Sequence, residues 1–148
     1  MKEKFISAYM DVAERFAQLS HAQRAKVGAI IVKDDRIISI GYNGMPSGWD
    51  NECETEQKTG NTGYGRKLVT KPEVLHAETN AIAKVAQSSE SCKDAVLFCT
   101  HEPCIECAKL IYQSGISEVY FKNTYDAAKG SGRDFLEKSG CVVEHLSE

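Results

Sequence analysis

The chain has 148 residues, a formal net charge of −3 and a pI near 5.8, and 42% of its residues are hydrophobic. This length and apolar content predict one globular domain over residues 1–148 that buries a core without disulfide help. The acidic balance argues against a protein that coats a polynucleotide or an anionic membrane, because both tasks favour a basic surface. No stretch reaches membrane-spanning length and the N-terminus lacks the pattern of a signal peptide, so we expect a cytoplasmic protein with reduced cysteines.

The first half of the chain predicts a helix and a hairpin. Apolar side chains recur every three or four positions over residues 2–18, which indicates an amphipathic helix. The segment "VGAIIVKDDRIISIGYNG" has two β-branched runs around a polar turn at residues 33–36, which is typical of a β-hairpin. Residues 45–72 are rich in Gly, Thr, Asn, Glu and Lys without an apolar period, so we expect a long ordered loop or insertion there.

The second half alternates helices and strands. Helices are predicted at about 76–87, at a segment with Pro103 in its first turn and Gly115 as its stop, and at "GRDFLEKSG". Strands are predicted at "DAVLFCT", "ISEVYFK" and "CVVEHL". Because crossover helices require parallel strands and the hairpin requires antiparallel ones, we expect a three-layer α/β/α domain with a mixed five-stranded sheet.

Four chemically reactive side chains fall at the starts of two predicted helices. His76 and Glu78 begin the helix in "VLHAETNAIAKV", and Cys104 and Cys107 are three residues apart in "EPCIECAKL", so these two share nearly one helix face. One imidazole and two thiolates suit Zn²⁺, and three protein ligands leave the fourth position for water, as in catalytic sites. Zinc lowers the pKa of such a water toward roughly 7, and Glu78 is placed to carry its proton.

These residues and the motifs "KVGAIIV", "GYNGMPSG", "HAETNAI" and "PCIECAKLI" resemble the zinc-dependent cytidine and deoxycytidylate deaminase superfamily. The "GYNG" turn and the insertion before "HAE" resemble its deoxycytidylate (dCMP) branch. The resemblance covers most of residues 27–121 and fades over residues 50–72 and after residue 122. It implies zinc ligands His76, Cys104 and Cys107 and a catalytic Glu78, which together deaminate dCMP to dUMP and ammonia and so supply dUMP for thymidylate synthesis.

The resemblance also implies substrate and effector residues. Asn43 resembles a polar residue beside the sugar, suited to the 3′-hydroxyl, but a turn asparagine with a left-handed backbone explains it equally well. The other substrate candidates, some of them suited to a 5′-phosphate, are Arg24, Lys26, Ala77, Lys122 and Tyr125. Members of this family are commonly hexamers that dCTP with Mg²⁺ activates and dTTP inhibits. The allosteric candidates are Gly41, Tyr42 and Gly44.

Several alternatives stay open on sequence grounds. A lone Cys-x-x-Cys pair is often half of a structural zinc site, but no second pair is present. His101 in "HEPCIEC" is a rival third ligand, although that assignment leaves Glu78 without a role. Cys53 lies where some relatives hold a second zinc, without an evident partner set. The alternative functions are deamination of another base or of a polynucleotide, and a non-catalytic zinc-stabilised nucleotide sensor.

Overall fold

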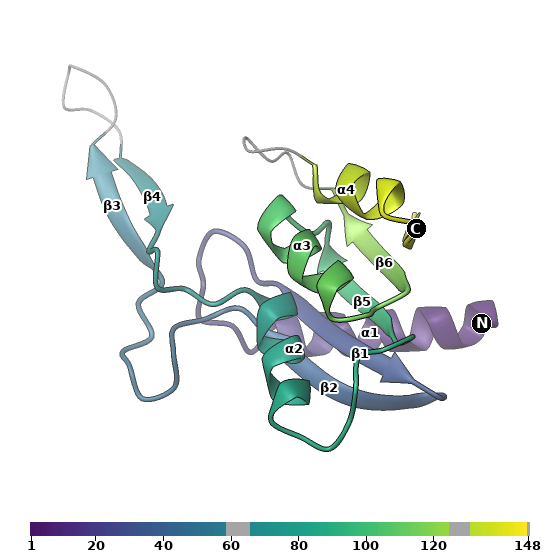
Figure 1. Cartoon of the computed structure of the whole chain (residues 1–148). Coiled ribbons are helices and arrows are strands. Elements are labelled where there is room, and N and C mark those ends of the chain that lie inside the picture. Colours follow the sequence, from purple (N-terminus) through teal and green to yellow (C-terminus); the bar gives the residue numbers. More distant parts are fainter. Residues whose placement is uncertain (59–65, 125–130, 148) are drawn as a thin grey trace.

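The structure, a computed structural model, describes residues 1–58, 66–124 and 131–147. A five-stranded sheet carries helices on both faces (Figure 1). The helices are α1 (Glu3–Ala17), α2 (Ala77–Ala86), α3 (Ile105–Gln113) and α4 (Gly132–Lys138). The strands of the sheet are β1 (Gly28–Lys33), β2 (Arg36–Tyr42), β5 (Val96–His101), β6 (Glu118–Asn123) and β7 (Val142–His145). No helix in these ranges is both long and apolar enough to cross a membrane.

The sheet topology brings several strand ends together at one edge. The strand order is β2-β1-β5-β6-β7, with β1 antiparallel to β2 and β5, and with β5, β6 and β7 parallel. The predicted mixed five-stranded sheet and α/β/α layering are thereby confirmed. His101 at the end of β5 pairs in register with Asn123 at the end of β6, and the start of β1 at Gly28 lies beside Thr100. Residues that follow or precede these strands therefore meet at one edge.

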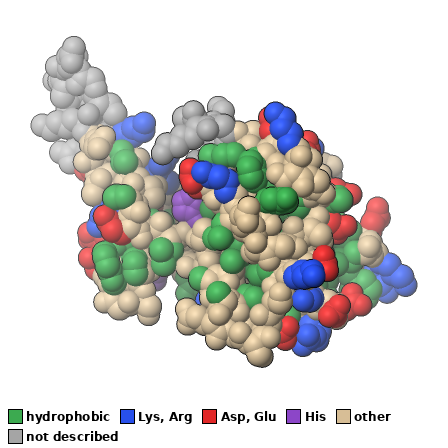
Figure 2. All heavy atoms as spheres, in the orientation of Figure 1, with side chains coloured by type: hydrophobic (Ala, Val, Ile, Leu, Met, Phe, Trp, Pro, Cys, Tyr) green, Lys and Arg blue, Asp and Glu red, His purple; other side chains and the backbone are tan. Residues whose placement is uncertain are grey.

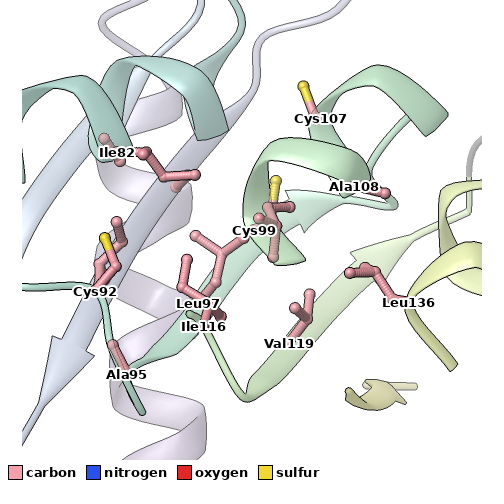
Figure 3. Packing of buried hydrophobic residues seen from close by; sticks show 14 of the residues in the cluster. Ile82, Cys92, Ala95, Leu97, Cys99, Cys107, Ala108, Ile116, Val119 and Leu136 are labelled. Carbon is pink, nitrogen blue, oxygen red and sulfur yellow. The ribbon is translucent and has the colours of Figure 1, made fainter. Parts of the chain in front are cut away.

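Each face of the sheet has its own apolar core, because alternate strand residues point to opposite sides. On the α1 face the buried residues are Met10, Ala13, Ile30, Val32, Phe98 and Tyr120. The other face packs against α2, α3 and α4, and Figure 3 shows part of this cluster, with Cys107 at the start of α3 and Cys99 on β5 below it. This cluster includes residues of α2, α3 and α4 as well as residues of the sheet, so these three helices pack on the same face.

A glycine lets α2 approach the sheet closely. A Cβ atom on Gly41 of β2 would collide with the carbonyl oxygen of Ala77 at the start of α2 and crowd the amide of Ala81. The chain before α2 is also held, because Gly44 and Leu75 exchange two backbone hydrogen bonds of 3.1 and 2.8 Å. Both contacts fix the position of the first turn of α2.

The predicted loop over residues 45–72 contains a second, small sheet that the sequence did not reveal. Strands β3 (Glu54–Lys58) and β4 (Arg66–Thr70) pair antiparallel, with Glu54 opposite Thr70. Figure 1 shows this hairpin extending away from the main sheet. None of the side chains described in the strands "ETEQK" and "RKLVT" is buried, and the two sequences lack the apolar–polar alternation by which strands are recognised.

Candidate active site

Three metal-ligating side chains meet where α2 and α3 begin. His76 is the N-cap residue of α2, Cys104 is the N-cap residue of α3, and Cys107 lies in the first turn of α3. The Nδ1 atom of His76 lies 3.2 Å from the Cys107 Sγ and 3.7 Å from the Cys104 Sγ, and the three ligand atoms all lie within 4.8 Å of one another. A tetrahedral zinc ion with bonds of about 2.1 Å to nitrogen and 2.3 Å to sulfur separates its ligands by roughly 3.5–3.8 Å. The donor atoms and their spacing therefore fit zinc.

The protonation of the cluster also favours a cation. A hydrogen bond with the Cys107 thiol lowers the pKa of Cys104 to about 3, and the backbone N–H of Cys107 also donates to the Cys104 sulfur. The same interaction raises the pKa of Cys107, so the two sulfurs hold one proton between them. The hydrogen bond with Cys104 raises the pKa of His76. A divalent ion would displace these protons, and the two helix N-termini would help to stabilise the thiolates.

Glu78 lies beside this cluster and is buried, with 4% of its surface exposed. Burial raises the pKa of its carboxyl group, and a hydrogen bond with its own backbone N–H, the nearby His76 and a hydrogen bond with Cys107 partly oppose that rise. A carboxyl group with a raised pKa exchanges protons more readily near neutral pH than a surface carboxylate does. Glu78 is therefore suited to proton transfer next to a metal-bound nucleophile.

A pocket of about 220 Å³ opens beside the cluster. Figure 2 shows a hollow between the region below the hairpin and the rest of the molecule, with histidine side chains at its margin. His76 and Cys104 of the cluster line this pocket, whereas Cys107 is buried and is not part of the lining. The walls come from the start of α2, the segment before β1, the hairpin and the end of β5; they include Arg24, Val27, Asn43, Glu54, Thr70, Ala77, Glu78, His101 and Glu102.

The structure brings together only some of the predicted substrate residues. Arg24, Asn43 and Ala77 line the pocket, and the Arg24 guanidinium donates to the Thr70 hydroxyl at 3.2 Å. Lys26 is exposed and is not part of the lining.

Two further candidates come from the end of β6 and the segment after it. Lys122 forms a 2.8 Å ion pair with Glu14 of α1 and is not among the residues that line the pocket. Tyr125 lies outside the described residues. In contrast, Glu54 and Thr70 are lining residues that the sequence did not predict, because they belong to the unrecognised hairpin.

Asn43 holds the wall of the pocket through both ends of its amide group. Its Oδ1 accepts from the Val27 N–H at 2.9 Å, and its Nδ2 donates to the Ala25 carbonyl at 2.8 Å. The Ser20 hydroxyl donates to the Asn43 carbonyl at 2.7 Å. Asn43 is not among the described residues with a positive φ, so the explanation by a left-handed turn is wrong. Each amide atom keeps capacity for one more hydrogen bond, which a ligand can use.

Replacing Asn43 by alanine is expected to lower the free energy of unfolding by about 1–3 kcal/mol, because the partly buried Val27 N–H and the exposed Ala25 carbonyl both lose their partner. Urea denaturation of the zinc-loaded protein measures this loss. The exposed Asn51 offers a matched control, and Asn51→Ala should change stability by less than about 0.5 kcal/mol. Equal stabilities of the two variants would show that the amide does not hold the wall.

Two rival metal assignments are resolved by geometry. The Nδ1 of His101 lies 2.9 Å from the Thr100 Oγ1, and the cluster of three ligands in the described chain contains His76 instead. Cys53 is buried, and its thiol lies 3.7 Å from the Asn51 carbonyl. Within the described ranges no group of three metal-ligating residues includes Cys53.

A second pocket of about 610 Å³ lies beside the "GYNG" turn. Tyr42 and Gly44 line it, together with Lys84 of α2, whereas Gly41 is not part of its lining and instead packs against α2. Asn43 lines both this pocket and the one beside the metal ligands. The two pockets therefore share a wall.

Comparisons with a protein family and with curated proteins agree on one family of deaminases. Residues 3–123 match the family described as the cytidine and deoxycytidylate deaminase zinc-binding region. The deoxycytidylate deaminase of Enterobacteria phage T4 is 32% identical over 168 residues, which cover 93% of this chain and 87% of the phage protein. The deoxycytidylate deaminase of Pongo abelii is 44% identical over 151 residues, which cover 91% and 82% of the two chains.

Solved structures add a relative with bound nucleotides. The crystal structure of dCMP deaminase from the cyanophage S-TIM5, in complex with dCMP and dUMP, is 45% identical with a TM-score of 0.86 and covers 99% of each chain. A structure from a study of tRNA:A34 deaminases has 24% identity and a TM-score of 0.58, and covers 96% of this chain and 98% of that one. The second likeness extends to the fold alone.

Proposed function

Because the chain belongs to the family of zinc-binding cytidine and deoxycytidylate deaminases, we propose that it hydrolyses dCMP to dUMP and ammonia. The observation that carries the proposal is the cluster of His76, Cys104 and Cys107 with the buried Glu78 beside it, at the end of a pocket. A relative that matches 99% of the chain at 45% identity binds dCMP and dUMP. The dUMP product would supply thymidylate synthesis.

The chemistry assigns a clear task to Glu78. Zinc, when held by His76, Cys104 and Cys107, supplies a hydroxide nucleophile at neutral pH. Glu78 accepts one proton of the attacking water and delivers it to the ring nitrogen N3. The oxygen is added at C4, the bond from C4 to the amino nitrogen breaks, and Glu78 passes the second proton to that nitrogen. One water is thus consumed and one ammonia is released for each dUMP formed.

The walls of the pocket favour a single nucleotide as substrate. The Ala77 N–H belongs to the first turn of α2, where backbone donors lack helical partners, so it can donate to the base carbonyl. Asn43 is proposed to contact the sugar hydroxyl, and Arg24, Lys26, Lys122 and Tyr125 remain candidates for the phosphate. On the face that Figure 2 shows, basic and acidic side chains of the described residues are interspersed, and no stripe of basic side chains suited to a polynucleotide is visible among them.

The second pocket is proposed to bind a regulatory nucleotide. It is lined by Tyr42, Gly44 and the cationic Lys84, which suit the ring and phosphates of dCTP or dTTP with Mg²⁺. Since Asn43 lines both pockets and holds the segment before β1, a ligand in one pocket can bias the wall of the other. We further propose that the protein forms a hexamer, that dCTP activates it and that dTTP inhibits it.

A substrate panel tests the function. Zinc-loaded protein would be incubated with dCMP, CMP, dCTP, cytidine and adenosine, each with and without dCTP and Mg²⁺ or dTTP, and deamination followed by ultraviolet absorbance. We expect turnover confined to dCMP, raised by dCTP and lowered by dTTP. Turnover of another base would overturn the substrate, and no ammonia from any of these compounds would favour a nucleotide sensor. Unaltered rates with both triphosphates would refute the regulation alone.

A further inference from the structure

His101 is a pocket residue to which the proposed chemistry gives no task. It lies at the end of β5, three residues before Cys104, and its half-buried ring lines the pocket beside the metal ligands. Burial lowers the pKa of its imidazole, so the ring is neutral at physiological pH. A neutral imidazole has one donor nitrogen and one acceptor nitrogen, and which nitrogen carries the proton decides what the ring offers a ligand.

The hydrogen bonds of Thr100 fix that proton. The Gly28 N–H donates to the Thr100 Oγ1 at 3.1 Å, so the oxygen acts as acceptor there. Thr100 is 3% exposed, and the one other partner described for its hydroxyl is the His101 Nδ1 at 2.9 Å. The hydroxyl proton therefore points to Nδ1, and the imidazole proton is on Nε2. The ring is held by its Nδ1 side and presents an N–H at its far end.

This N–H has no hydrogen-bond partner among the described residues. His101 ends β5, which lies between β1 and β6 in the sheet, and the segment before β1 and the end of β6 both carry residues predicted to bind the phosphate. Arg24, in the segment before β1, lines the same pocket. Lys122, near the end of β6, is instead ion-paired with Glu14. Among the described residues that the sequence suggested for the phosphate, Arg24 lines the pocket and Lys26 and Lys122 do not. His101 adds a second hydrogen-bond donor to this lining.

We infer that His101 donates its Nε2–H to the 5′-phosphate of the nucleotide substrate, held in that tautomer by Thr100. The inference rests on the proposed function, since it concerns the same pocket. The proposed contacts of the Ala77 N–H with the base carbonyl and of Asn43 with the sugar leave the 5′-phosphate, whose anionic oxygens are strong acceptors for an N–H donor that lines the same pocket. His101 would then be a specificity residue that distinguishes a nucleoside monophosphate from the free nucleoside.

The test compares two substrates in two variants. His101→Leu removes the donor and keeps an apolar side chain, whereas His101→Gln places an amide N–H near the position of Nε2. We expect His101→Leu to lower kcat/KM for dCMP by about 10- to 100-fold, as for a hydrogen bond to a charged group, and to change that for deoxycytidine by less than about threefold. His101→Gln should stay within about fivefold of wild type on dCMP. Where deoxycytidine turnover is too slow, inhibition constants of dUMP and deoxyuridine give the same comparison.

The outcomes separate this inference from the function on which it rests. Wild-type protein that fails to deaminate dCMP would refute the proposed function. Wild-type turnover combined with equal losses for dCMP and deoxycytidine in His101→Leu would overturn the phosphate contact and point to the base. The ¹⁵N spectrum of the zinc-loaded protein, with the His101 signals assigned from the variants, should show the proton on Nε2. A proton on Nδ1 would also overturn the inference.

Discussion

Replacing Glu78 by glutamine is expected to lower kcat for dCMP by about 10²- to 10⁴-fold, the range that a positioned proton-transfer group contributes. Glutamine matches the size of glutamate and can still occupy the buried site in the first turn of α2. It cannot accept a proton from water or pass one to the base. The fall should therefore be in kcat, with KM nearly unchanged, because the amide preserves the shape of the pocket.

Two measurements show whether this loss is chemical. Zinc content by elemental analysis and the midpoint of urea unfolding should match those of the wild type, since Glu78 is not a zinc ligand in the proposed site. Glu73→Gln, at an exposed glutamate before α2, is the matched control and should retain full activity. Wild-type turnover in Glu78→Gln would remove Glu78 from the mechanism. Loss of zinc in this variant would instead make it a structural part of the metal site.

Replacing Cys107 by alanine is expected to abolish both zinc retention and turnover. Cys107 is 2% exposed, and its sulfur lies 3.2 Å from the ligand nitrogen of His76. Without it two ligands remain, too few for a stable tetrahedral site. Dialysis against a chelator should leave the wild type with about one zinc per chain and the variant with almost none. Deamination of dCMP should fall to background.

Thermal unfolding gives a readout that does not depend on catalysis. Binding of zinc to the folded state stabilises it, so added zinc should raise the melting temperature of the wild type and leave that of Cys107→Ala unchanged. Cys141→Ala is the matched control, because Cys141 is also a buried cysteine but its thiol donates to the Ile116 carbonyl at 3.5 Å, outside the cluster. A zinc-dependent shift in Cys107→Ala would show that the metal is bound elsewhere.

The chemical centre and most elements of the domain follow from the sequence itself. His76 and Glu78 are two positions apart at a helix start, and Cys104 and Cys107 are three apart at another, so short-range helical geometry places each pair. The hairpin and the crossover helices likewise follow from local periodicity and the rules of strand connection. The three metal ligands and Glu78 were thus recognisable, because the two residues of each pair are close in sequence and chemically distinctive.

Only the tertiary structure decides which other residues join this centre. Arg24, Thr70 and His101 line one pocket although they come from three segments far apart in the chain, whereas Lys122 pairs with Glu14, 108 positions away. The hairpin that contributes Thr70 has no buried side chain among those described in its two strands, and its sequence carries no period-two pattern. Such contacts depend on strand order and on long-range packing. Local propensity and spacing identify the reactive groups, and the fold determines the walls around them.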